Sequence, residues 1–187
     1  MFSPSPSAGA IRWNIVRVRA HSQTECIVLG DKFLPLSTHW IAAGRGRSVL
    51  CPVDDCPLCE FLPVRGFFYL PVMWDSRQAI LELSAMASSH FEQHCKFLHG
   101  GIRPGLIVQL SRKGTKQPIR SEVIGEHEGA RVVEFGLFVA RVMAVYNYPP
   151  CNPHEPIEVY ERRLQAAARV RAKRIVEELQ TSKSPGV

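Results

Sequence analysis

The chain of 187 residues is long enough for one domain with its own core, and its 45% hydrophobic and 21% charged residues are ordinary for a globular protein. Lys and Arg number 23 against 17 acidic residues, a formal charge of +6 that permits an anionic partner without requiring one. No stretch of about 18 apolar residues predicts a membrane-spanning helix, and the N-terminus lacks the pattern of a secretory signal. We therefore expect a cytoplasmic protein of a bacterial or phage-infected cell, with no membrane partner.

The first half of the chain is expected to form short β-strands. Residues 1–10 are rich in Pro, Ser and Gly, which predicts a disordered leader. The segments that follow are rich in β-branched and aromatic residues, and the turn-like pair Asp75-Ser76 predicts a hairpin between the last two. The expected strands are Ile11–Arg19, Glu25–Leu29, Phe67–Trp74 and Gln78–Leu83.

In the second half, the apolar pattern changes between helical and strand-like spacing. Ser84 can cap a helix that Gly100 and Gly101 would end. Beyond it, the spacing predicts a strand, a partner strand and an apolar segment that could be helix or strand, with helix favoured. After a proline-rich break it predicts one long helix rich in Ala, Arg and Glu. That last helix could pack on the domain, reach a partner subunit or contact nucleic acid. These segments are, in order, Leu106–Arg112, Lys116–Ile124, Phe135–Tyr146 and Glu155–Gln180.

Three of the six cysteines lie between residues 51 and 59, and they predict a metal site. Cys56 and Cys59 form a C-x2-C knuckle, in which two thiolates can bind one tetrahedral ion while nearby backbone N–H groups stabilise the sulfur charge. Cys51 precedes the knuckle, and His39 can supply the fourth ligand. Three Cys and one His make a closed shell, so we expect one structural Zn²⁺ ion whose binding energy adds to folding stability.

Other interpretations of the cysteines and histidines stay open. A thioredoxin-like redox pair belongs at a strand-to-helix junction within a βαβ pattern, which does not surround Cys56, and unliganded thiols are a further alternative. His90 and His94, four residues apart on one helical face, could form a second metal site. The competitors for the fourth ligand are His21 and the group His90, His94, Cys95 and His99. The isolated Cys26, Cys95 and Cys151 are expected in the core.

Strand-like segments follow the metal motif in a distinctive order. After His39 and Cys51 come DDCPLCEF, then GFFYLPVMW, then AILELS before a helix, and then PGLIVQLSRKG. Over about residues 35–115, this pattern resembles the zinc-containing single-stranded DNA-binding proteins of T-even-type phages. The resemblance implies an OB barrel with a zinc subdomain and cooperative, largely sequence-independent binding of single strands. It does not extend to the C-terminus, which is basic here, whereas the phage proteins carry an acidic tail that recruits replication partners.

The strand count, the helix between strands and this resemblance together predict the fold class. We expect a mainly β protein with helical additions, in which an OB-like small β-barrel carries an inserted zinc knuckle and a long C-terminal helix. The expected division is a leader over 1–10, an OB-like domain over 11–148 that includes the knuckle at 39–63, and a helical extension over 155–181.

Basic and aromatic residues on neighbouring segments predict a groove for a single-stranded nucleic acid. Residues 1–24 and 101–121 hold several basic side chains and no acidic one. Phosphates would bind the basic residues with salt-sensitive affinity, and aromatic rings would stack on bases. On the aromatic strand Phe67 and Tyr69 share one face, while Trp74 lies on the opposite face, which is expected in the core. The candidate contacts are Arg12, Arg17, Arg19, Trp40, Arg45, Arg47, Arg65, Phe67, Tyr69, Arg112, Lys113, Lys116 and Arg120.

The sequence therefore favours a non-enzymatic, largely sequence-independent protein that binds single-stranded nucleic acid, most simply DNA and alternatively RNA, in replication, repair or recombination. The alternative is a zinc-stabilised protein-interaction module that docks, or self-associates, through its C-terminal helix. An enzyme is disfavoured, because the chain has no Walker loop, no GxSxG, no HExxH and no carboxylate pair in a nuclease-like setting.

Overall fold

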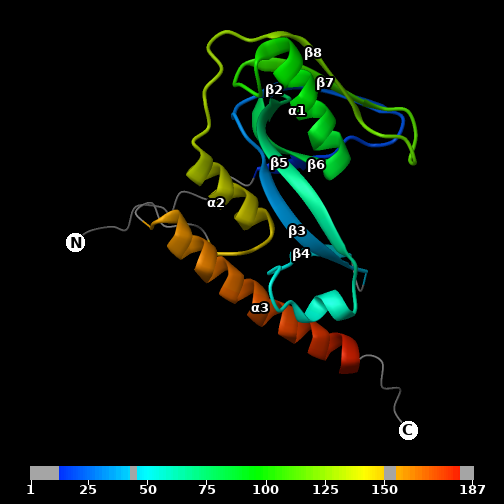
Figure 1. Ribbon diagram of the computed structural model, residues 1–187, viewed down its shortest axis with the longest axis vertical. Helices are drawn as coiled ribbons and strands as arrows, with labels where there is room; N and C mark the ends of the chain where they lie inside the picture. Colours follow the sequence, from blue (N-terminus) through cyan, green and yellow to red (C-terminus); the bar gives the residue numbers. More distant parts are fainter. Residues whose placement is uncertain (1–12, 43–45, 150–154, 182–187) are drawn as a thin grey trace, which may run out of the picture.

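The computed structural model describes residues 13–42, 46–149 and 155–181, and within these ranges the chain forms eight β-strands and three α-helices (Figure 1). None of the described helices is both long and apolar enough to cross a membrane. The strands are β1 (Asn14–Val16), β2 (Ser22–Val28), β3 (Leu34–Ile41), β4 (Arg47–Leu50), β5 (Val64–Trp74), β6 (Arg77–Ser84), β7 (Leu106–Arg112) and β8 (Arg120–Glu126). The helices are α1 (Ala85–His99), α2 (Phe135–Val145) and α3 (Ile157–Thr181), with a 3₁₀ turn, η1, at Pro57–Glu60.

The strands form one mixed sheet in the order β1-β6-β5-β2-β7-β8, with β3 and β4 attached to one end of β5. β1 and β6 are parallel, and the other neighbours are antiparallel. The eleven-residue β5 joins two lobes, because its first half pairs with β3 and its second half with β2. Figure 1 shows this long strand running from the β3–β4 lobe to the rest of the sheet.

The sheet is not closed, so the predicted barrel is wrong. The three-residue β1 pairs with the outer edge of β6, where a closing strand would have to lie. At the other edge α1 packs against β8, and the backbone N–H of Val123 donates a hydrogen bond to His94 Nε2 at 3.5 Å. Each edge strand, β6 and β8, is thus covered by β1 or α1 and does not pair with the other edge. Covered edges do not need to pair with each other to protect their backbone groups.

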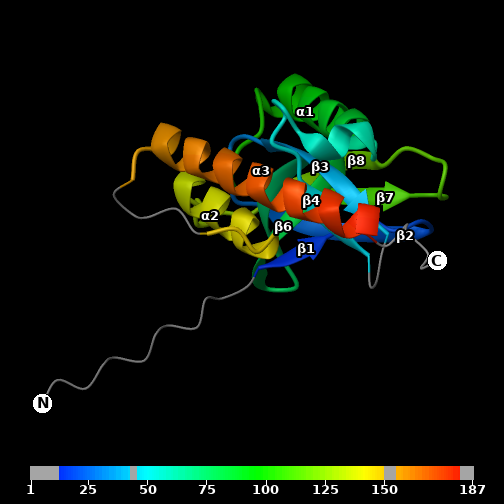
Figure 2. The same ribbon diagram turned by 90° about the horizontal axis from the view of Figure 1, so that it is seen from below.

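The two faces of β5 and β6 enter different cores because side chains alternate along a strand. Leu70 and Leu81 pack with Phe91 of α1, while Tyr69 and Ile80 pack on the other side with residues of α2 and α3. Figures 1 and 2 both place α2 and α3 side by side, and Figure 1 shows the two helices apart from α1. The long C-terminal helix therefore packs on the domain, and it does so through Tyr160, Leu164 and Ala168.

The burial of side chains along β5 shows that two expectations, for Tyr69 and for Trp74, are wrong. Tyr69 was expected as a stacking platform, but its side chain is completely buried beneath α2 and α3. Trp74 was expected in the core, but it lies at the end of the hairpin and remains 39% exposed. Phe67 is half-buried and borders solvent, as stacking requires.

Local signals in the sequence were accurate for the hairpin and for the first helix. Asp75 and Ser76 have φ values of +50° and +59°, which suits the two-residue turn between β5 and β6. The side chain of Ser84 accepts a hydrogen bond from the N–H of Ala87, and Gly100 ends α1 in the left-handed conformation. The β3–β4 hairpin was not predicted, because Pro35 and the turn-forming residues around it obscure the alternation.

Candidate metal centre and surrounding surface

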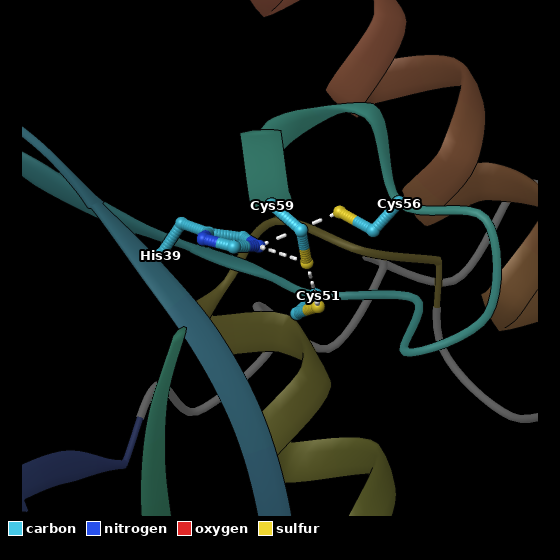
Figure 3. Close-up of side chains that lie close together, drawn as sticks. All are labelled: His39, Cys51, Cys56 and Cys59. Atoms are coloured by element: carbon cyan, nitrogen blue, oxygen red, sulfur yellow. Dashed lines mark hydrogen bonds between the residues drawn. The ribbon is translucent and has the colours of Figure 1, made fainter. Parts of the chain in front are cut away.

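The four predicted metal ligands converge on one point in the β3–β4 lobe (Figure 3). His39 lies on β3, Cys51 follows β4 directly, Cys56 precedes η1, and Cys59 lies within η1. One ligand atom from each residue lies within 4.8 Å of all the others. Residues up to 20 positions apart are thus close enough to hold a metal ion.

The distances between ligand atoms fit a tetrahedral ion. The Sγ atoms of Cys51 and Cys59 are 3.7 Å apart, and His39 Nε2 lies 3.4 Å from Cys56 Sγ and 3.7 Å from Cys59 Sγ. A Zn–S bond of about 2.3 Å at the tetrahedral angle separates two sulfurs by about 3.8 Å. A disulfide needs about 2.05 Å between sulfurs, so these cysteines are not bridged, and their spacing is compatible with a shared ion. The donor set and its spacing therefore fit zinc.

The imidazole of His39 is held in the orientation that a metal ligand needs. It is completely buried, and its Nδ1 lies 3.3 Å from the carbonyl oxygen of Pro63. When Nδ1–H donates to that carbonyl, the other nitrogen, Nε2, keeps its lone pair and faces the cysteines. This hydrogen bond is a common outer-shell feature of metal-binding histidines.

The loop between Cys51 and Cys56 has two non-glycine residues in the left-handed backbone conformation, which is unfavourable in an isolated peptide. Val53 and Asp55 have φ values of +60° and +51°, and the N–H of Asp54 bonds to the carbonyl of Pro52 at 2.6 Å. A positive φ is costly for a β-branched residue and persists only where surrounding contacts require it. Cys51 and Cys56, at the two ends of the loop, both belong to the ligand cluster and fix the loop there.

A small apolar core joins β3, β4 and η1, which together we call the metal lobe, to the second half of α3. Leu58 of η1 is completely buried and packs with Ala172 and Ile175 of the helix. Cys51 and Cys56 belong to the same cluster. The metal centre and the docking of α3 therefore support each other.

Because thiols must lose their protons to bind a metal ion, we expect metal binding by the cysteines to depend on pH. Without a bound ion, burial raises the pKa of the Cys51 thiol to about 12. An ion must therefore displace the proton of Cys51, and because metal ligands bind as thiolates we expect up to three protons released per chain when three cysteines bind. Because protons compete with the ion, zinc affinity should fall steeply between about pH 8 and about pH 6. Zinc titrations in weakly buffered solution measure both quantities, and an affinity independent of pH would contradict thiolate ligation.

The other histidines are not placed as ligands of this centre. His94 accepts the hydrogen bond from β8, and His99 Nδ1 lies 3.5 Å from a carboxylate oxygen of Glu126. Across the described ranges only the His39 cluster brings together three or more potential ligands, so the structure assembles no second site at His90 and His94. As predicted for isolated thiols, Cys26 and Cys95 are buried, whereas Cys151 lies outside the described residues.

Three predicted nucleic-acid contacts line one surface pocket of about 220 Å³, which we call the arginine pocket. Arg17 comes from the β1–β2 connection, Phe67 from β5 and Arg112 from the end of β7. Arg112 hydrogen-bonds to the carbonyls of Thr115 and Gln117, so it holds the β7–β8 loop against the pocket. Lys113 and Lys116 lie exposed in that loop, and Arg120 is exposed at the start of β8.

The remaining candidates lie elsewhere. Trp40 is 41% exposed in the metal lobe and packs over the backbone of Gly46, and Arg47 lies 3.7 Å from Glu178 of α3. Arg19 and Arg65 are exposed but do not line the arginine pocket. Arg12 and Arg45 fall outside the described residues.

Glu82, which was not predicted as a site residue, lies in the wall of the arginine pocket. Its side chain is only 8% exposed, and its two oxygens lie 2.5 and 3.1 Å from Nε and Nη2 of Arg17. Tyr69 donates a hydrogen bond to the same carboxylate and is also bonded to the hydroxyl of Tyr146. A carboxylate in the otherwise apolar run AILEL was a detectable signal, because a charge so placed is almost never buried without a partner.

Comparisons with known proteins do not place the chain in a family. It matches no protein-family model, and searches of curated proteins and of solved structures find no similar protein. The function is therefore inferred from the geometry of the chain itself.

Proposed function

We propose that the protein binds single-stranded nucleic acid, with DNA favoured over RNA as the ligand. We also propose that its metal centre holds one structural zinc ion. The observation that carries the proposal is the arginine pocket, in which Arg17, Phe67 and Arg112 come together from three separate segments. The guanidinium groups of Arg17, which is ion-paired with Glu82, and of Arg112, which also bonds to loop carbonyls, lie beside a half-buried aromatic ring. Phosphate binding by such groups and base stacking on the ring are the two requirements for holding a single strand. Lys113 and Lys116 of the adjacent loop add positive charge.

The strand order supports an OB-like interpretation of the sheet. The neighbours β6-β5-β2-β7-β8, with α1 between β6 and β7, correspond to five antiparallel strands in the order 3-2-1-4-5 with a helix between the third and fourth. OB-folds bind single strands on the face of strands 2 and 3 and with the loops after strands 1 and 4. Here those loops correspond to the metal lobe and to the basic β7–β8 loop, which borders the arginine pocket.

The alternative, a protein-interaction module that uses the C-terminal helix, has less support. The apolar face of α3 is occupied within the chain, since Tyr160, Ala168 and Ile175 are all buried. Partner binding through that face would require the helix to leave two cores. A zinc ion with four protein ligands has no open position for a substrate, so such a site is structural. We therefore propose a non-enzymatic role in replication, repair or recombination within the cytoplasm.

Replacing Phe67 with Leu tests the proposal. If a base stacks on this ring, affinity for a single-stranded oligonucleotide should fall by about 1–3 kcal/mol. Fluorescence anisotropy at several salt concentrations measures this loss. The salt dependence should change little, because no charge is removed.

The matched control is Phe97→Leu, since Phe97 is 89% exposed on α1 and lies outside the arginine pocket. This variant should bind like the wild type. Failure of the wild-type protein to bind single strands even at low salt would reject the proposed function.

A further inference from the structure

The two arginines of the arginine pocket are anchored by the same edge of their guanidinium groups. Nε and Nη2 of Arg17 donate to the two carboxylate oxygens of Glu82, at 2.5 and 3.1 Å. Nε and Nη2 of Arg112 donate to the carbonyl oxygens of Gln117 and Thr115. A guanidinium has five N–H donors, so each of these anchors uses two donors and leaves three. Both arginines are thus held in place with donors left over for a ligand.

The carboxylate of Glu82 is itself held from the side of the core. Its side chain is 8% exposed, and the hydroxyl of Tyr69 donates a hydrogen bond of 3.1 Å to its Oε2. A tyrosine hydroxyl has one proton, so the hydrogen bond between the Tyr69 and Tyr146 hydroxyls takes its proton from Tyr146. Burial raises the pKa of both tyrosines, so both hydroxyls stay protonated at neutral pH. The position of the carboxylate is therefore fixed by two buried side chains.

The anchoring of Arg17 matters for binding because its side chain is 58% exposed. A long side chain at the surface samples many rotamers, and fixing it when a ligand binds lowers the affinity. The two contacts with Glu82 fix the guanidinium before a ligand arrives. A carboxylate in the wall of a phosphate-binding pocket also repels the phosphate. Any favourable effect of Glu82 on phosphate binding therefore has to act through Arg17.

We propose that Glu82 is a positioning residue for nucleic-acid binding, which orders Arg17 so that the free edge of its guanidinium meets a backbone phosphate. Tyr69 and Tyr146 support Glu82 from the core, so the hydroxyls of two buried tyrosines contribute to the affinity of a surface pocket. This inference rests on the proposed function, and it adds a carboxylate that strengthens the binding of an anion.

The first test is the variant Glu82→Gln, which keeps the length of the side chain and an acceptor for Tyr69 but loses the charge pair with Arg17. Its affinity for a single-stranded oligonucleotide, measured by fluorescence anisotropy, should fall about two- to tenfold, the cost of ordering one long side chain on binding. Electrostatic repulsion alone predicts the opposite, because the variant removes a negative charge from the pocket. Unchanged or tighter binding would therefore overturn the inference.

The variant Arg17→Gln separates positioning from a general effect on the fold. Alone, it should weaken binding and reduce the slope of log affinity against log salt concentration by about one, because one phosphate contact is lost. Combining it with Glu82→Gln should cause no further loss, since the residue through which Glu82 acts is absent. If Glu82→Gln weakened binding equally in this background, Glu82 would act independently of Arg17, contrary to the inference.

The matched control is Glu126→Gln, which makes the same change in charge. Glu126 is 52% exposed, forms an ion pair with Arg103 and does not line the arginine pocket. This variant should bind at least as tightly as the wild type. A loss of affinity as large as that of Glu82→Gln would mean that the loss does not report on Arg17, and the inference would fail.

If Glu82→Gln does not fold, the variant Tyr69→Phe decides. It removes the hydroxyl that fixes Glu82 and changes no charge, and Tyr69 is completely buried, so it cannot touch the strand. We expect binding at least about twofold weaker than that of the wild type, and unchanged affinity overturns the inference. If the wild type binds single strands but these variants do not weaken binding, positioning by Glu82 is wrong and the proposed function stands. Absence of binding by the wild type at low salt rejects the function itself.

Discussion

Replacing Cys56 with Ser is expected to remove the metal and to lower the free energy of unfolding by on the order of 5 kcal/mol. Structural zinc contributes roughly 10–16 kcal/mol of binding free energy in small zinc-folded peptides, so losing one of four ligands should remove a large part of it. The loss reaches beyond the ion, because Cys56 lies in the same apolar cluster as Ala172 and Ile175 of α3. Metal analysis and chemical denaturation of the purified protein measure the two effects.

Cys95→Ser is the matched control for this substitution. Cys95 is 1% exposed, comparable to the 8% of Cys56, but it belongs to α1 and to a different core. We expect this variant to lose only the cost of a buried hydroxyl, about 1–3 kcal/mol, and to keep a full metal complement. Wild-type metal content and stability in Cys56→Ser would contradict the proposed zinc centre.

Replacing Tyr160 with Ala is expected to destabilise the protein by about 3–5 kcal/mol, the range for truncating a buried aromatic side chain. Tyr160 is completely buried in the core that α2 and α3 form with Tyr69 and Ile80. Its hydroxyl also donates a hydrogen bond of 3.1 Å to the carbonyl of Pro149. Thermal or chemical unfolding measures the change, and a loss this large means that α3 is an integral part of the domain.

Val170→Ala provides the comparison on the same helix. Val170 is 71% exposed, so its truncation should change the free energy of unfolding by less than about 0.5 kcal/mol. If Tyr160→Ala were equally mild, α3 would be a dispensable extension, and the core that it forms with the sheet would contribute little.

The metal cluster could be predicted from the sequence because its chemistry is local. Cys56 and Cys59 are three residues apart, and Cys51 stands close before them, so one loop supplies three ligands. The hairpin turn at Asp75-Ser76 and the caps of α1 were predictable for the same reason, since backbone preferences act over a few residues. His39 was a weaker inference, because β3 and its pairing with β5 decide where its side chain lies.

Sheet closure and the covering of strand faces could not be predicted. The alternation correctly put Phe67 and Tyr69 on one face, but it did not show that α2 and α3 would cover Tyr69 and leave Phe67 at the margin. The barrel failed because the short β1 and α1 occupy the two sheet edges, and both contacts join distant parts of the chain.

By itself, the sequence determined which residues can bind a metal, where the hairpin turns, and where α1 begins and ends. These properties depend on ligand chemistry and on local backbone preferences, which act between near neighbours. Only the tertiary structure decided which charges and rings meet, since Arg17, Phe67 and Arg112 share a pocket only after three segments pack together. It also decided that α3 covers the sheet and supports the metal lobe, because burying its apolar face requires partners far away along the chain.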